Sequence, residues 1–273
     1  MLRSPFAINT YSYVWRHTAR ECLEQLADEG HRRFELLVNA PHLWPASLDR
    51  QARDGVARLL SERGLQVISL NPPSLDLNLV APAEEVRRYT IDHYLQVIDL
   101  AGEWGTPWVV VVPGKTHPLL PAPRERVLDW FTGALDEMLA RAEAMGVELL
   151  LENVPMAFLP RAEDLVAVVE RIAHPRLGIV YDVANGVFAG EAPDEGLFAV
   201  REHLRLVHLS DTGTGRWDHG PVGSGVVPFP AVAAALDEIG YSNPSVLEII
   251  SGQPEQDIPA SARALEALGW PGD

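Results

Sequence analysis

The sequence predicts a single (β/α)₈ barrel, and three observations support this fold class. The chain has 273 residues, which is a usual size for one such barrel. Short apolar runs alternate with long amphipathic stretches along the chain, as expected for repeated βα units. The apolar runs are nearly continuous, which is typical of parallel strands covered on both faces. We therefore predict that residues 1–273 form one barrel domain.

Eight apolar runs supply the predicted strands, and a helical stretch follows each of them. Gly64, Gly105, Gly146 and Gly240 precede four of the runs, and glycine commonly ends a helix in the left-handed conformation. An open doubly wound sheet is the alternative, but no glycine-rich phosphate loop follows the first run. The runs are 6–9, 34–38, 66–70, 108–112, 147–151, 178–182, 204–209 and 246–250, and long helical stretches include 84–104 and 124–145.

Composition disfavours several classes of partner. The net charge is −16, whereas binding to nucleic acid or to anionic lipid needs a basic surface. No apolar run reaches membrane-spanning length, and the first residues lack the apolar core of a signal peptide. We expect a cytoplasmic protein without nucleic-acid or membrane partners. Cys22 is the one cysteine, so neither an internal disulfide nor a thiolate zinc cluster can form, and its helical setting predicts a small core residue.

Four consecutive predicted strands each end in one potential metal ligand. These ligands are Glu152, Asp182, His208 and Glu248. Carboxylates rarely lie in buried apolar runs unless they are paired or bind a metal. In this fold the carboxyl ends of the strands converge over the mouth of the barrel. Alone, each glutamate could form an ion pair and the histidine could be a satisfied core residue, but four at matching depth favour a metal site.

The donor set predicts the kind of cation. Three carboxylate oxygens and one imidazole nitrogen, without a thiolate, favour one divalent ion, with Mn²⁺ preferred and Mg²⁺, Co²⁺ or Zn²⁺ possible. Three converging negative charges repel one another strongly unless a cation separates them. This repulsion is the physical reason to expect a bound metal.

The segments that carry these ligands resemble a known family. They read LLLEN, IVYDVAN, VHLSD and VLEII, and their order and spacing resemble the xylose-isomerase-like superfamily of metal-dependent barrels. That superfamily, the sugar phosphate isomerase/epimerase and endonuclease IV group, also includes ketose 3-epimerases, hydroxypyruvate isomerase, and inosose and 3-dehydroshikimate dehydratases. The resemblance spans nearly the whole chain.

The resemblance implies a reaction. In the family, residues matching Glu152 and Glu248 also act as acid and base. The leading hypothesis is therefore an isomerase or epimerase that acts through an enediolate on a keto sugar or a related hydroxy-ketone. The alternative is a metal-dependent lyase of the inosose or 3-dehydroshikimate dehydratase kind, or one that eliminates from an oxidised glycoside. A third possibility is a non-catalytic barrel that binds metal or sugar.

Departures from the family argue against a nuclease. Endonuclease IV needs additional histidines for a three-metal cluster, but this chain has Asn71, Pro113 and Asn185 at the matching positions. In the loop WDHGPVGSG, Trp217 replaces the acidic ligand of the family. Together with the negative net charge, these changes disfavour phosphodiester cleavage.

Other rim residues are predicted to contact the substrate. Asn185 stands where ketohexose epimerases usually carry histidine, and we predict that His219 faces the substrate rather than a second metal. Arg216 either holds a substrate carboxylate or hydroxyl through its planar donor fork or is a solvated loop residue. Lys115 lies just beyond the fourth predicted strand and could also reach the substrate.

Two further features have more than one interpretation. Glu35, inside the second predicted strand, is either part of a structural ion pair or a substrate contact. Trp15, Trp44 and Trp217 follow strands one, two and seven, and such tryptophans form either an apolar wall of the site or an interface. The second interpretation predicts a homo-oligomer.

Overall fold

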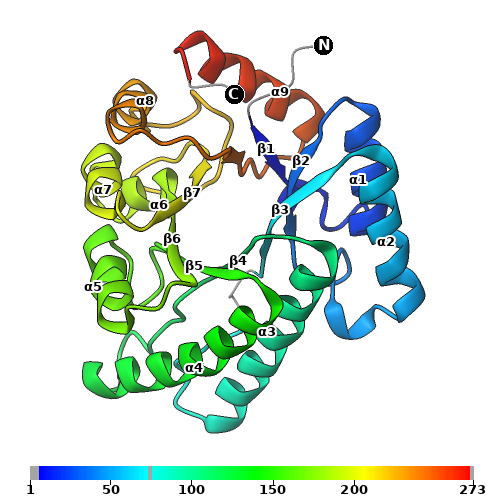
Figure 1. Cartoon of the computed structure of the whole chain (residues 1–273). Coiled ribbons are helices and arrows are strands. Elements are labelled where there is room, and N and C mark those ends of the chain that lie inside the picture. Colours follow the sequence, from blue (N-terminus) through cyan, green and yellow to red (C-terminus); the bar gives the residue numbers. More distant parts are fainter. Residues whose placement is uncertain (1–5, 73–75, 271–273) are drawn as a thin grey trace.

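Eight parallel strands close into a barrel in chain order, from β1 to β8 and back to β1. The computed structural model describes residues 6–72 and 76–270. Figure 1 shows the strands at the centre and the helices in a ring around them. The predicted (β/α)₈ fold is confirmed. The strands are β1 (Ala7–Asn9), β2 (Arg33–Leu37), β3 (Gln66–Asn71), β4 (Trp108–Val111), β5 (Glu148–Glu152), β6 (Leu177–Asp182), β7 (Leu204–Leu209) and β8 (Ser245–Leu247).

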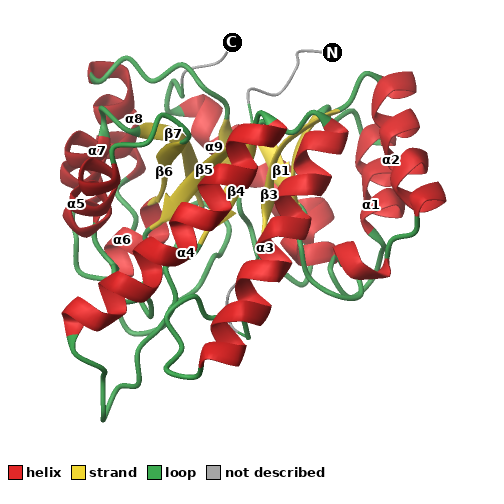
Figure 2. Cartoon of the chain, turned by 60° about the horizontal axis from the view of Figure 1, so that its bottom comes forward, coloured by secondary structure: helices red, strands yellow, loops and turns green. Residues whose placement is uncertain are grey.

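Helices connect the strands on the outside of the barrel (Figure 2). The predicted helical stretches 84–104 and 124–145 coincide with α3 and α4. Gly64, Gly105 and Gly146 end their helices in the left-handed conformation, as predicted. Within the described residues, no helix has the length and apolar character needed to cross a membrane. The helices are α1 (Ala19–Asp28), α2 (Arg50–Arg63), α3 (Glu84–Trp104), α4 (Arg124–Met145), α5 (Ala162–Ile172), α6 (Val183–Phe188), α7 (Pro193–Val200), α8 (Phe229–Glu238) and α9 (Pro254–Ala267), with short 3₁₀ turns at Tyr11–Tyr13 and Pro45–Ser47.

The eighth strand is shorter than the apolar run 246–250 predicts. Strand β8 ends at Leu247. The next amide, of Glu248, still donates to the carbonyl of Leu209 on β7, but the amide of Ile250 donates to the carbonyl of His219 in a loop, at 2.7 Å. The chain therefore leaves the sheet at Glu248 because its hydrogen-bond partner changes from a strand to a loop.

Two apolar layers support the site. A large cluster fills the space between the strands and the helices and includes the fully buried Cys22, in agreement with its predicted core position. A second, smaller cluster fills the inside of the barrel and comes from every strand except β2. This packed interior is typical of the fold and forms the floor beneath the carboxyl ends of the strands. Its members are Ala7, Ile68, Val110, Leu150, Val180, Leu206 and Val246.

Candidate metal centre

Four strands place their ligands by one simple rule. Side chains that are two positions apart on a strand point to the same face. In β5, β6, β7 and β8 the residue two positions after the interior apolar residue is therefore also directed into the barrel, one layer closer to its mouth. These four residues are Glu152, Asp182, His208 and Glu248.

The four side chains meet at one point. One ligand atom from each of them lies within 4.8 Å of the others, and all four residues are buried. The Nδ1 atom of His208 is 3.2 Å from Oε1 of Glu152, 3.4 Å from Oε2 of Glu248 and 3.9 Å from Oδ2 of Asp182. The structure thus brings together the complete ligand set that the sequence predicts, in a geometry that could hold a metal ion.

One buried oxygen atom indicates that these residues fit a cation. Oδ2 of Asp182 is buried and has no hydrogen-bond partner, and an unpaired buried carboxylate oxygen is costly. Burial raises the pKa of Asp182 from its ordinary 3.8 to about 7, even though His219 lowers it. Burial also raises the pKa of Glu152. A cation at the centre of the cluster would partner the free oxygen and favour the ionised carboxylates, so the donor set fits a divalent metal.

Glu35 lies on the other side of the imidazole. Its side chain is fully buried, and its Oε2 is 3.1 Å from Nε2 of His208. Ser69 donates to the same carboxylate at 2.6 Å, and Asn9 donates to it at 2.6 Å. Of the two interpretations of Glu35, the geometry favours the buried ion pair. A carboxylate in this position holds the Nε2 proton, which leaves Nδ1 free to face the metal centre.

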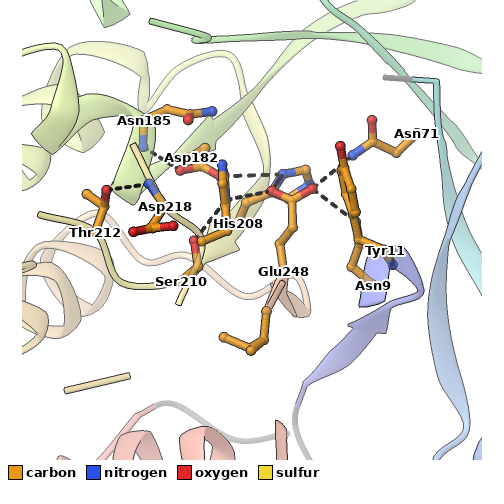
Figure 3. A network of polar contacts seen from close by, with 12 residues as sticks. Asn9, Tyr11, Asn71, Asp182, Asn185, His208, Ser210, Thr212, Asp218 and Glu248 are labelled. Atoms are coloured by element: carbon orange, nitrogen blue, oxygen red, sulfur yellow. Dashed lines mark hydrogen bonds and ion pairs between the residues drawn. The ribbon is translucent and has the colours of Figure 1, made fainter. Parts of the chain in front are cut away.

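Two asparagine amides hold Glu248. Nδ2 of Asn9 donates to Oε1 of Glu248 at 3.1 Å, and Nδ2 of Asn71 donates to the same oxygen at 3.3 Å. In Figure 3, Glu248 lies between these asparagines on one side and Asp182 on the other. Although burial by itself raises the pKa of Glu248, the two neighbouring histidines hold it below its ordinary value. Glu248 is therefore a fixed, ionised carboxylate.

His219 lies beside the predicted ligands. Its Nδ1 is 3.0 Å from Oγ of Ser210, 3.3 Å from Oε2 of Glu248 and 3.6 Å from Oδ2 of Asp182. Burial lowers its pKa, but Asp182 and Glu248 outweigh burial and raise it to about 9. The ring also lines the cavity above the cluster. It could therefore contact both a ligand carboxylate and a bound substrate.

Asn185 and Trp217 are linked across the cavity wall. The backbone amide of Asn185 donates to Oδ1 of Asp182 at 2.7 Å, so that Asp182 also caps α6. Oδ1 of Asn185 accepts a hydrogen bond of 2.8 Å from Nε1 of Trp217. Trp217, which takes the place of the family's acidic ligand, thus orients the amide of Asn185 and forms part of the wall.

A cavity of about 290 Å³ opens directly above the ligand cluster. The predicted substrate residues Asn185 and His219 line it, whereas Arg216 and Lys115 are exposed and do not. Nε of Arg216 is 3.2 Å from Oδ2 of Asp218. The remaining lining residues are Tyr11, Asn71, Val112, Glu152, Val154, Trp217, Asp218, Glu248 and Ile250.

Sequence reasoning missed several residues of this site. Asn9 and Tyr11 were not singled out, yet the first bonds Glu248 and the second lines the cavity. Asn9 follows from the same two-residue step that positions the ligands, because Ala7 is the interior residue of β1, whereas Tyr11 lies in the 3₁₀ turn after that strand. Applied to β1, that step is the signal that could have found Asn9.

The loop that carries Trp217 and His219 is anchored by one buried carboxylate. Oδ2 of Asp211 accepts from the amide of Gly223 at 2.8 Å, and its Oδ1 accepts from the amide of Val227 at 3.0 Å. These contacts tie the far end of the loop to the end of β7. The aromatic wall of the cavity is therefore built on a fixed loop.

Comparisons with known proteins agree with this architecture. A family model described as "Xylose isomerase-like TIM barrel" matches residues 23–268. An L-ribulose 3-epimerase of Mesorhizobium japonicum (strain LMG 29417 / CECT 9101 / MAFF 303099) is 27% identical over 256 residues, which cover 90% of this chain and 82% of that protein.

Solved structures share the fold over nearly their full length. A D-tagatose 3-epimerase-like protein superposes with a TM-score of 0.84 at 24% identity, and covers 96% of this chain and 97% of its own. The IOLI protein with a bound zinc atom gives a TM-score of 0.80 at 19% identity, with 97% and 96% covered. At these identities the similarity shows the fold.

Proposed function

Because this chain belongs to the xylose isomerase-like TIM-barrel family, we propose that it is a divalent-metal-dependent isomerase or epimerase. It acts on a keto sugar or a related hydroxy-ketone through an enediolate. The observation that carries this proposal is the meeting of Glu152, Asp182, His208 and Glu248 at the floor of one cavity. The relative named an L-ribulose 3-epimerase supports the same class of reaction.

The cation supplies one kind of chemistry. A divalent ion, for which Mn²⁺ fits the oxygen-rich donor set and Zn²⁺ occurs in one structural neighbour, stabilises negative charge that develops on neighbouring substrate oxygens. Glu152, Asp182, His208 and Glu248 would hold it. Glu35 would orient His208 toward it through the contact with Nε2.

Glu152 and Glu248 would move the protons. Glu152 ends β5 and Glu248 directly follows β8, and their carboxylates lie 3.2 and 3.4 Å from Nδ1 of His208. One carboxylate removes a proton from the carbon beside the carbonyl, and the other returns a proton. If both act on the same carbon, the product is an epimer; if the proton returns to the neighbouring carbon, the product is an isomer.

The experiment that tests the proposal follows the proton itself. Metal-loaded protein is incubated in D₂O with ketopentoses and ketohexoses, and NMR and mass spectrometry identify the products. We expect deuterium beside the carbonyl in a product of unchanged composition. Loss of water would instead indicate the lyase, and absence of any exchange across the sugars would contradict enediolate chemistry.

Matched variants locate the proton transfer. Glu152→Gln and Glu248→Gln remove one carboxylate each and are expected to abolish exchange, whereas Glu62→Gln changes an exposed residue of α2 and serves as the control. Metal content is measured for each variant, because both glutamates are also proposed ligands. A glutamine variant that keeps full exchange would remove that residue from the mechanism.

A further inference from the structure

The charges of the residues that line the cavity affect which kind of sugar can bind in it. Glu152, Asp218 and Glu248 are all acidic, and among the lining residues of the described chain there is neither lysine nor arginine. The three carboxylates of the ligand cluster carry one more negative charge than a divalent cation supplies. Because the His219 imidazole is also paired with two of these carboxylates, the floor offers no excess positive charge to attract a phosphate group, and charges in a low-dielectric cavity interact strongly.

The two cationic residues predicted to contact the substrate, Arg216 and Lys115, do not line the cavity. Nε of Arg216 is 3.2 Å from Oδ2 of Asp218, and the side chain is 83% exposed. Lys115 is exposed and lies outside the lining, and its backbone amide is held by Oδ1 of Asn78. His219, the remaining basic group at the cavity, already faces Glu248 and Asp182. The usual means of holding a phosphate, a free guanidinium or ammonium, is thus missing from the described wall.

The rest of the wall suits uncharged hydroxyl and C–H groups. Tyr11, Trp217 and three aliphatic residues provide apolar surface. Nδ2 of Asn71 is used to donate to Glu248 and Glu35, so its Oδ1 remains as an acceptor. Oδ1 of Asn185 is used to accept from Trp217, so its Nδ2 remains as a donor. A few fixed polar groups in an apolar cavity are typical of small-molecule sites.

From this wall we infer that the substrate is an unphosphorylated, uncharged ketose and that the site discriminates against the corresponding sugar phosphate. The inference rests on the proposed function, since it concerns the same cavity. The discrimination has two sources: no lysine or arginine of the described wall compensates a phosphate dianion, and Asp218 places a carboxylate at the wall and is the ion-pair partner of Arg216. An unfavourable contact with the wrong substrate is an effective way to build specificity.

The test compares matched pairs on metal-loaded protein. D-ribulose is compared with D-ribulose 5-phosphate, and D-fructose with D-fructose 6-phosphate, by the kcat/KM of proton exchange in D₂O. We expect the free sugar to be preferred by about tenfold or more, the range in which a charge-lined cleft alters the local concentration of an ionic substrate. Asp218→Asn should lower the ratio of kcat/KM for the free sugar to kcat/KM for its phosphate several-fold. The change removes a negative charge from the cavity wall and also removes the ion-pair partner of Arg216. Asp237→Asn, on the exposed face of α8, is the control and should leave the ratio unchanged.

Two results would overturn the inference, and a third would contradict one of its two sources. A sugar phosphate used as well as the free sugar would overturn it directly. If Lys115→Ala then abolished the use of the phosphate, the phosphate would be held by Lys115 at the rim. An unchanged ratio in Asp218→Asn would remove Asp218 as a source of discrimination. If no sugar of either kind exchanged a proton, the proposed function itself would fail, and the inference with it.

Discussion

The two halves of the barrel contribute to the site in different ways. Strands β5 to β8 each supply one residue of the ligand cluster. Strands β1 to β3 supply Asn9, Glu35, Ser69 and Asn71, whose side chains bond to one another and to the ligands but are not ligands. One half would bind the ion, and the other half orients two of the groups that bind it.

The comparison shows how a fixed geometry is obtained. Three carboxylates and an imidazole are flexible, mutually repelling groups, and a site gains precision when surrounding residues lock their rotamers and proton positions. Glu35 does this for His208, and Asn9 does it for Glu248. If this division is correct, changes in the ligand half should act on metal binding more strongly than changes in the supporting half.

The largest effect is expected from a ligand. Asp182→Asn keeps a side chain that can still cap α6 but removes the charge that faces the centre. We expect metal affinity to fall more than about 100-fold, beyond the range seen when an outer partner of a ligand is changed. Isothermal titration with Mn²⁺ or Zn²⁺ measures this, with Asp237→Asn as the control. Wild-type affinity in Asp182→Asn would show that Asp182 is not a ligand.

The next effect is expected from the supporting carboxylate. Glu35→Gln preserves shape but removes the charge next to Nε2 of His208. We expect metal affinity to fall about 10- to 100-fold, as for other changes to the outer partner of a ligating histidine. The same titration checks it, with Glu62→Gln alongside and circular dichroism to confirm folding. If affinity fell as much as in Asp182→Asn, the two halves would not differ in the way described.

A smaller and different effect is expected from the asparagines. Asn9→Ala removes a donor from Glu248 and from Glu35, and a hydrogen bond to a charged group contributes about 1.5–3 kcal/mol. We expect kcat of the proposed exchange to fall about tenfold or more. Asn71→Ala should cost less, because its two bonds of 3.2 and 3.3 Å are longer. The reverse order would show that Asn71, which also lines the cavity, acts mainly on the substrate.

The smallest effect concerns the stability of chelator-treated protein. Burial raises the pKa of Asp182 from 3.8 to about 7, and the pKa of His219 rises from 6.5 to about 9 because Asp182 and Glu248 outweigh its burial. Between the ordinary and the raised values, the folded state holds protons that the unfolded state has released. The free energy of unfolding therefore falls as pH rises through this range. The lowered pKa of Glu248 has the opposite effect, but only below its ordinary value of 4.5.

Thermal unfolding across this pH range measures that decline. For a chain of this size we expect Tm to fall by about 2–4 °C for each kcal/mol lost. Saturating metal should reverse the decline, because the ligands must be deprotonated to bind it. A Tm of metal-free protein that increased steadily between pH 5 and 9 would contradict the raised values.

Much of the fold and the ligand set could be predicted because both are local in the sequence. Each strand is a short apolar run, and each ligand lies at or directly beyond the end of one. The contacts made by the supporting half could not be predicted in the same way. Asn9 and Ser69 are ordinary polar residues whose neighbours in the sequence do not indicate their partners.

Two charged residues show where the sequence leaves the site undecided. Arg216 and Lys115 looked like substrate contacts because they follow strands at the carboxyl face of the barrel. In the structure neither residue lines the cavity, and Arg216 pairs with Asp218. Their predicted roles in substrate binding remain to be tested by the sugar-phosphate comparison.

The sequence by itself determined the barrel and the four candidate ligands, because apolar periodicity and the residues at strand ends are properties of short segments. Only the tertiary structure decided which groups hold those ligands and which charges face the substrate. Asn9 and Glu248 are 239 positions apart and meet because β1 pairs with β8 to close the barrel. Contacts of this kind depend on closure of the whole chain, and no local pattern encodes them.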